Sequence, residues 1–206
     1  MQRRGKFLLF SIDELNRWLE ASHFNRSVER IQNHHTYIPT YAEFTGNNHF
    51  RLLQAMEESH LERGFDEIAQ NLTTFPDGMI AVCRSFEKDP AGIRGANRGG
   101  ICIENLGDFD EGRDLMTDRQ REVIVHLNAS LCHKFNLSPN TDTILYHHWY
   151  DRETGRRTNG AGVTKTCPGT GFFGGNTVEA AQTHFIPLII KALCELTSPV
   201  RHRMLQ

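Results

Sequence analysis

Helical and extended hydrophobic patterns alternate along this chain. Apolar residues recur at helical spacing in residues 11–21, 49–63 and the stretches that begin at Thr117 and Thr177. Shorter apolar runs predict strands at 27–33, 79–83, 100–106 and 143–146. The predicted order is helix, strand, helix, hairpin, strand, helix, strand, helix, without an internal repeat. We therefore predict a single α/β domain with a mixed central β-sheet flanked by helices.

Capping and turn residues set the expected boundaries of these elements. Ser11 and Thr117 are each followed three residues later by Glu or Gln, the spacing of a capping box. Residues 75–78 (Phe-Pro-Asp-Gly) are typical of a hairpin turn. Pro187 is expected to kink or split the last helix because it lacks a backbone N–H. The residues from Pro199 onward are polar and basic, and we expect a frayed tail there.

Length and charge narrow the functional classes. The chain has 206 residues, which suits one domain over 1–206, with its core at about 27–190 and the helix 11–21 as an appendage. Its formal net charge of -2 provides no basic field to attract nucleic acid. No segment approaches the roughly 20 apolar residues of a membrane span. The apolar run 7–10 is too short for a signal peptide, so we expect a cytoplasmic protein as encoded.

Two histidine pairs and one cysteine are candidates for a metal site. His34-His35 and His147-His148 each stand where a predicted strand ends, where α/β folds carry ligands. Cys167 precedes Pro-Gly and therefore lies at a turn. One histidine from each pair with Cys167 would give zinc three protein ligands and an open fourth position, as in catalytic sites. The alternative is that both pairs are packed or hydrogen-bonded surface features, and that the cysteines are small buried apolar side chains.

Four stretches of the chain resemble one family. They are residues 34–36 (His-His-Thr), 66–78, 100–104 (Gly-Ile-Cys-Ile-Glu), and 145–148 (Leu-Tyr-His-His) together with 165–169 (Lys-Thr-Cys-Pro-Gly). In these motifs the chain is similar to the zinc-dependent N-acetylmuramoyl-L-alanine amidases, which include phage lysozyme-type amidases and peptidoglycan recognition proteins. The likeness covers roughly residues 27 to 190. Its most specific part is Lys-x-Cys-Pro-Gly with an upstream histidine.

The resemblance implies an amidase/peptidoglycan-recognition-like fold and one zinc ion per chain. His34, His147 and Cys167 match the family's zinc ligands, and Lys165 matches a lysine that would point to the fourth zinc position. The implied reaction is hydrolysis of the amide between N-acetylmuramic acid and L-alanine, with peptidoglycan or a muropeptide as the partner. Access to a cell wall after lysis or non-classical release is compatible with this function. The oligomeric state stays open.

The chain departs from the family pattern at the expected general base. Gln70 stands where many members have a tyrosine, and Asn71 where they have a histidine; both are expected to hydrogen-bond substrate instead. Other members use a glutamate that aligns with Cys102. Glu104 lies two residues further and on the same strand face, so we predict that it is the base. The alternative is a structural ion pair between Glu104 and Arg98.

Two loops leave alternatives open. Arg94 and Arg98 are candidates to bind a carboxylate of a peptide stem, since guanidinium matches carboxylate; the alternative is that both are solvated. The loop 149–164 is a lid, a specificity element or a tolerated insertion.

Two other functions remain compatible with these motifs. One is a non-catalytic module that binds peptidoglycan, and the other is a zinc hydrolase of the same fold that acts on a different acyl-amino bond.

Overall fold

The computed structural model describes residues 1–198, and the tail expected from Pro199 lies outside them. The helices and strands follow in the order β1 (Gln2–Arg4), β2 (Phe7–Phe10), α1 (Ile12–Ala21), β3 (Arg30–His35), α2 (His49–Glu62), β4 (Leu72–Thr74), β5 (Ile80–Val82), β6 (Gly100–Asn105), α3 (Asp118–Phe135), β7 (Ile144–Tyr146), α4 (Val178–Ala180) and α5 (Ile186–Thr197). Short 3₁₀ turns lie at Tyr41–Glu43, His147–Trp149 and Phe172–Gly174, and a π-helical turn at Ala181–Phe185. No helix of the described part is long and apolar enough to cross a membrane.

The strands form one seven-stranded sheet in the order β1-β2-β5-β4-β6-β3-β7. The first four strands of that order pair antiparallel, and β4, β6, β3 and β7 pair parallel. The structure therefore confirms the predicted α/β fold with a mixed sheet. The parallel half carries the ends of β3 and β7, where the two histidine pairs stand.

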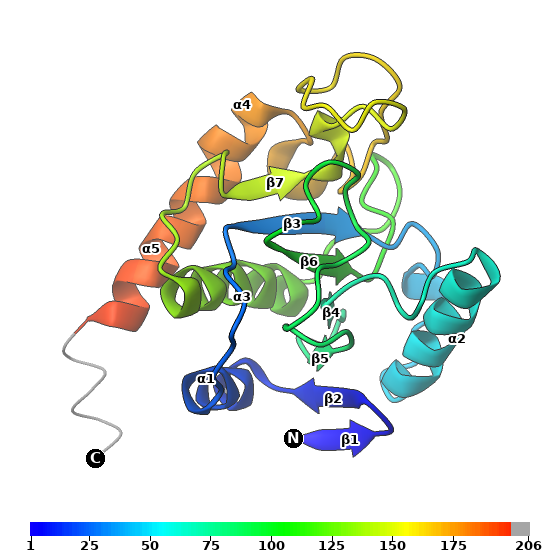
Figure 1. Cartoon of the computed structure of the whole chain (residues 1–206), viewed down its shortest axis with the longest axis vertical. Coiled ribbons are helices and arrows are strands. Elements are labelled where there is room, and N and C mark those ends of the chain that lie inside the picture. Colours follow the sequence, from blue (N-terminus) through cyan, green and yellow to red (C-terminus); the bar gives the residue numbers. More distant parts are fainter. Residues whose placement is uncertain (199–206) are drawn as a thin grey trace.

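The two faces of the sheet are covered unequally. On one face, α1, α3 and α5 bury a large core that includes Leu15, Leu127 and Ile189. On the other face, α2 packs Leu53 and Met56 against a smaller core over β2 and β5. Figure 1 shows α2 set apart from α1, α3 and α5, at the opposite side of the sheet. We call the second face the α2 face; over β6 and β3 it is covered by loops instead of a helix.

The N-terminal segment is more closely integrated than expected. The chain begins with a hairpin, β1–β2, and β2 continues the sheet by pairing with β5. This hairpin was not predicted because Gln2–Arg4 contains no apolar residue and is exposed, so it has no alternation to detect. The helix expected at 11–21 forms, but it is no appendage, since Leu15 and Leu19 are buried in the large core.

The helix boundaries bear out most of the capping predictions. The capping box at Ser11 is complete. At Thr117 only half of it forms: Thr117 accepts the backbone N–H of Gln120, but the Gln120 side chain turns into the core and donates to the carbonyl of Leu106. Pro187 splits the last helix as predicted, because α5 begins next to it directly after the π-helical turn.

Candidate metal centre

The register of the sheet places the candidate residues in one row across the α2 face. Thr73 on β4 lies opposite Glu104 on β6, which lies opposite His34 on β3. On the other side of β3, Asn33 lies opposite Tyr146, so His147 follows at the level of His34. Side chains at partnered positions point to the same face. The row therefore brings a carboxyl group and two imidazoles together from three strands.

Cys167 reaches this row from the loop before α4. Its sulfur accepts a hydrogen bond from the backbone N–H of His35 at 3.4 Å. Its carbonyl accepts the backbone N–H of His148 at 2.7 Å, and the Cys167-Pro168 peptide bond is cis. Backbone contacts from both histidine pairs thus fix a cysteine that lies far from them in the sequence.

The three side chains converge with the spacing of a tetrahedral site. The Nδ1 atoms of His34 and His147 are 3.1 Å apart, and the Cys167 Sγ is 3.5 Å from the His34 Nδ1. All three ligand atoms lie within 4.8 Å of one another. Bonds of about 2.0–2.1 Å to nitrogen and about 2.3 Å to sulfur give tetrahedral edges of about 3.3 and about 3.6 Å. The residues present therefore fit a zinc ion in both chemistry and spacing.

Burial keeps both imidazoles in the form that binds metals. It lowers the pKa of His34 well below its ordinary value, and the charges of His147 and Lys165 add to this. Burial, with Lys165 and Arg152, lowers the pKa of His147 to about 3. Burial also raises the pKa of the Cys167 thiol well above its ordinary value, with Glu104 adding to the effect. A bound cation would reverse that direction, because it stabilises the thiolate.

Glu104 is the carboxyl group of the site. Its Oε1 atom is 3.8 Å from the His34 Nδ1, and its Oε2 atom is buried without a hydrogen-bond partner. Burial raises the pKa of Glu104 to about 8, against the opposing charges of Lys165 and Arg63. Within residues 1–198 no arginine forms an ion pair with Glu104, so the alternative pairing with Arg98 is not formed.

A second group, His34, Cys102 and Glu104, also has its ligand atoms within 4.8 Å of one another. This second group shares His34 with the first group. In the first group, the distances from the His34 Nδ1 to the His147 Nδ1 and to the Cys167 Sγ match the edges of a tetrahedral zinc site. Cys102 is fully buried on β6, two residues before Glu104. In the sequence alignment, Cys102 stands at the strand position where some family members have a glutamate.

Gln70 and Asn71 lie in the interior, and the structure does not bring them to the row as free hydrogen-bonding groups. The Gln70 amide donates to the hydroxyl of Thr73 at 3.1 Å, and its oxygen is buried without a partner. The Asn71 side chain donates to the carbonyl of Ser85 and accepts the backbone N–H of Cys102. Asn71 therefore links the β4–β5 hairpin to β6, and the Gln70 amide bonds to the Met56 sulfur and to Thr73, the neighbour of Glu104.

Exposed cations surround the row. Lys165 is exposed, and its charge lowers the pKa values of His34, His147 and Glu104. The charge of Arg63, at the end of α2, lowers the pKa of Glu104, and the charge of Arg152, in the loop 149–164, lowers the pKa of His147. Sequence reasoning found Lys165 but missed both arginines, because no motif marks a helix-end or loop arginine.

The loop 91–99 packs against the metal ligands. A Cβ added at Gly92 would lie 2.3 Å from the Gln32 Oε1 and 3.1 Å from the His34 Nε2, so a side chain there would displace these groups or the loop. Sequence reasoning treated this glycine as a loop residue. Arg94 donates to the carbonyl of Arg152 at 3.2 Å, whereas Arg98 is exposed.

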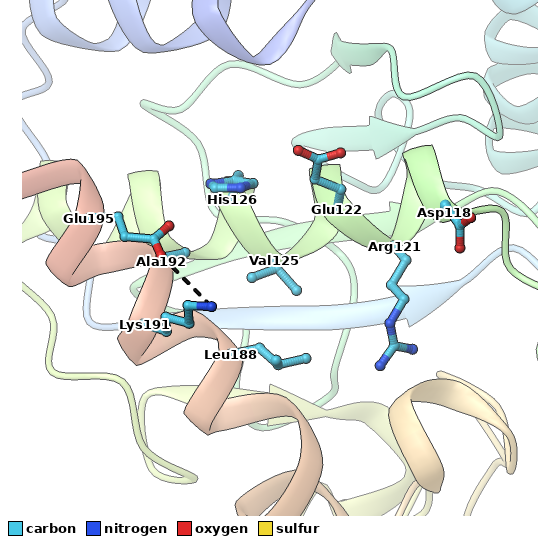
Figure 2. Close-up of a pocket in the computed structure, with 9 residues that line it drawn as sticks. All are labelled: Asp118, Arg121, Glu122, Val125, His126, Leu188, Lys191, Ala192 and Glu195. Carbon is cyan, nitrogen blue, oxygen red and sulfur yellow. Dashed lines mark ion pairs between the residues drawn. The ribbon is translucent and has the colours of Figure 1, made fainter. Parts of the chain in front are cut away.

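A separate groove lies between α3 and α5, on the face of the sheet opposite the row (Figure 2). Its volume is about 250 Å³, and Val125, Leu188 and Ala192 form its apolar floor. Lys191 and Glu195 form an ion pair at its edge. None of the candidate metal ligands lines it.

Comparison with known families gives one match. The family described as N-acetylmuramoyl-L-alanine amidase matches residues 24–170, which is well over half of the chain. The matched range includes His34, Glu104, His147 and Cys167. No curated protein sequence matches the chain significantly.

Solved structures share the fold. Drosophila PGRP-LB is 23% identical, with a TM-score of 0.57, over 78% of this chain and 83% of that chain. Peptidoglycan recognition protein-LE is 23% identical, with a TM-score of 0.57, over 78% and 82%. The endolysin N-acetylmuramoyl-L-alanine amidase LysCS from Clostridium intestinale is 22% identical, with a TM-score of 0.52, over 71% and 78%. At these identities the likeness shows the fold alone.

Proposed function

This chain belongs to the N-acetylmuramoyl-L-alanine amidase family, and from that we propose that it is a zinc-dependent hydrolase of peptidoglycan or muropeptides. The bond that it cleaves is the amide between N-acetylmuramic acid and L-alanine. The convergence of His34, His147 and Cys167 carries this proposal, since it leaves a fourth position for chemistry. The relative PGRP-LE was solved in complex with tracheal cytotoxin, a monomeric diaminopimelic acid-type peptidoglycan, which supports a substrate of this class.

His34, His147 and Cys167 would hold the zinc ion. When bound, zinc supplies a Lewis acid that polarises a carbonyl and makes water more acidic. The backbone N–H of His35 donates to the Cys167 sulfur and would stabilise its thiolate form.

In this proposal Glu104 moves the proton of the reaction. Its carboxylate accepts a proton from the attacking water and passes it to the leaving nitrogen of the alanine. Its Oε1 lies 3.8 Å from the His34 Nδ1, so it is beside the ligands without being needed as one of them. Lys165 is exposed next to the row and would stabilise the negative charge that develops on the carbonyl oxygen.

Metal content and cleavage test the proposal together. Purified protein is expected to contain about one equivalent of zinc and to release peptide with a free amino-terminal alanine from an N-acetylmuramoyl peptide. Full activity in a folded, metal-free protein would rule out the mechanism. Cleavage of another acyl-amino bond in place of this one would identify a hydrolase of the same fold with a different substrate.

A peptidoglycan-binding module without catalysis is the second candidate. It is favoured by one observation: the position aligned with the family's tyrosine is Gln70, which is buried and bonded to Thr73. Such a module would bind a muropeptide and release no alanine. The same incubation, with binding measured in parallel, separates the two functions.

A further inference from the structure

His34 has one nitrogen atom that the proposed zinc site does not use. Its Nδ1 lies 3.1 Å from the His147 Nδ1 and 3.5 Å from the Cys167 Sγ. Its Nε2 is buried and has no hydrogen-bond partner among residues 1–198. A histidine that binds a metal through one nitrogen normally has a partner at the other. The His34 side chain is 2% exposed, so its Nε2 is a position where a second ligand can bind away from bulk solvent.

The thiol of Cys102 lies on the same side of His34 as this nitrogen. A Cβ added at Gly92 would lie 2.9 Å from the Cys102 Sγ and 3.1 Å from the His34 Nε2. Both atoms therefore border one point under the loop 91–99. A thiolate and an imidazole nitrogen are ligands that suit zinc and similar cations.

Glu104 completes a set of three ligands. It follows Cys102 by two residues on β6 and lies opposite His34 in the register of the sheet. One ligand atom from each of the three residues lies within 4.8 Å of the others. The Glu104 Oε2 is buried without a partner, as the His34 Nε2 is. The Glu104 side chain is 19% exposed, so an ion can reach this group from the row.

The loop 91–99 covers this group and is itself held at two points. Near its start, the Gln32 side chain accepts the backbone N–H of Ile93 at 3.1 Å. Further along, the loop packs on the loop that follows β7, where a Cβ on Gly95 would lie 1.9 Å from the carbonyl oxygen of Gly155. The three side chains are therefore kept together by a fixed cover on the α2 face.

We propose that His34, Cys102 and Glu104 form a second, weaker site for zinc or a similar thiophilic cation, and that filling this site inhibits hydrolysis. Binding releases the Nε2 proton of His34 and the thiol proton of Cys102 to solvent, and His34 then bridges the two sites as an imidazolate. The second site is the weaker one because it fills only when Nε2 loses its proton.

Inhibition follows from the engagement of Glu104. As a ligand of the second ion, its carboxylate is no longer free to accept the proton of the attacking water. This part of the inference rests on the proposed function, whereas the binding of the second ion does not.

Equilibrium dialysis against zinc counts the sites without catalysis. The wild type is expected to bind one zinc ion tightly and a second one at higher free zinc. Cys102→Ala should keep the first ion and lose at least about tenfold in affinity for the second. Cys102→Ser, which preserves the volume of the side chain, should behave in the same way because it also removes the thiolate. Cys132→Ala, at a buried cysteine of α3, is the matched control and should bind both ions.

Cobalt identifies the ligand of the second ion by spectroscopy. Because the thiolate is the form of cysteine that binds metals, each thiolate-bound cobalt ion adds to a sulfur-to-cobalt charge-transfer band. In the wild type the first equivalent should report Cys167, and the second equivalent should increase the band again. In Cys102→Ala the first increment should remain and the second should be absent.

Release of alanine shows what the second ion does. In the wild type it should fall over the range of free zinc that fills the second site. Each variant is compared with its own activity at one equivalent of zinc. Cys102→Ala should need at least about tenfold more zinc for the same inhibition, and Cys132→Ala should follow the wild type.

A wild type that binds a single equivalent at every zinc concentration overturns the inference, as does a second equivalent that survives both Cys102 variants. A second equivalent that depends on Cys102 but leaves the release of alanine unchanged overturns the inhibitory role. The same second equivalent in a protein that releases no alanine supports the site and refutes the proposed amidase activity. Release of alanine with one equivalent only does the reverse.

Discussion

The imidazole of His34 has two nitrogen atoms in different surroundings, and only one of them faces the proposed zinc site. Its Nδ1 faces His147 and Cys167, whereas its Nε2 is buried without a hydrogen-bond partner beside Gly92. A metal-binding histidine is usually oriented by a bond from its other nitrogen. Here the carbonyl of His34, held by the Asn105 side chain at 2.7 Å, and the packing of the loop 91–99 fix the ring instead.

Two substitutions at the row separate metal binding from proton transfer. Cys167→Ala is expected to lose both zinc and amidase activity, because two imidazoles alone are a weak site. Glu104→Gln is expected to keep zinc and lose about 10²–10⁴-fold in kcat, the usual contribution of a general base. Zinc is measured by elemental analysis and activity by release of alanine. Cys194→Ala, at an exposed cysteine on α5, is the control and should retain both.

The titration of His60 on α2 predicts how the stability of the fold changes in acid. Burial first, then Arg63 and Arg84, lowers the pKa of His60 from 6.5 to about 4, and its Nδ1 accepts the backbone N–H of Ala69. The unfolded chain therefore takes up this proton at a higher pH than the folded one. The stability contributed by neutral His60 is complete above pH 6.5 and declines as the pH falls toward 4.

The comparison is between His60→Asn and the wild type in urea unfolding at pH 7 and pH 5. The Asn oxygen can accept the same N–H without titrating, so the variant should lose less stability between the two pH values. His23→Asn, at an exposed position, is the control. An equal loss in His60→Asn and the wild type would contradict the prediction.

At the scale of elements, the loop 91–99 positions a strand residue. Gly92→Ala places a Cβ against the side chains of Gln32 and His34, so the loop or these side chains must move. We expect weaker zinc binding, measured by competition with a chelator, in a protein that is still folded. Gly64→Ala is a stricter control, because Gly64 has a positive φ of 83° and no neighbour within 4 Å, and this variant should bind zinc as the wild type does. Unchanged affinity in Gly92→Ala would show that the contact is not needed.

A buried pair of amides joins α3 to the sheet. Asn33 and Asn128 donate to each other at 2.9 and 3.1 Å, and both are fully buried. Asn128→Ala leaves the Asn33 amide unpaired and should cost about 1–3 kcal/mol of unfolding free energy. Replacing both residues by leucine removes both polar groups and should cost less than the single change. Denaturant unfolding of the two variants checks the order, and the reverse order would contradict it.

At the scale of the whole molecule, the family match and the folded unit differ in extent. The match begins at residue 24, but Phe10, Leu15 and Leu19 before it are buried in the large core, and Phe7 and Leu9 in the smaller one. Each contributes about 2 kcal/mol when buried, against a total stability of about 5–15 kcal/mol. A chain shortened to residues 24–206 should therefore be insoluble or strongly destabilised. Thermal unfolding and solubility, compared with the full chain, test this, and a stable truncated protein would contradict it.

Much of the fold and the site could be read from the sequence where local signals are strong. The helices, the strand 100–106 and the ligand residues follow from periodicity and from the motif Lys-x-Cys-Pro-Gly. The β1 strand was missed because it has no apolar residue, and Gln120 was assigned to a cap because spacing alone does not say where a side chain turns. Asn71 was expected at the substrate, and the structure instead uses it to link the hairpin to β6.

The sequence by itself determined the class of fold, the positions of the helices and which residue types are able to hold a metal, because periodicity and ligand chemistry are local properties. Only the tertiary structure decided that Glu104, His34 and His147 share one row, since strand register is set by pairing between distant segments. The same holds for the contact of Gly95 with Gly155. The sequence around each of these glycines does not indicate that the two are in contact. They meet only because both loops rise from adjoining parts of one sheet.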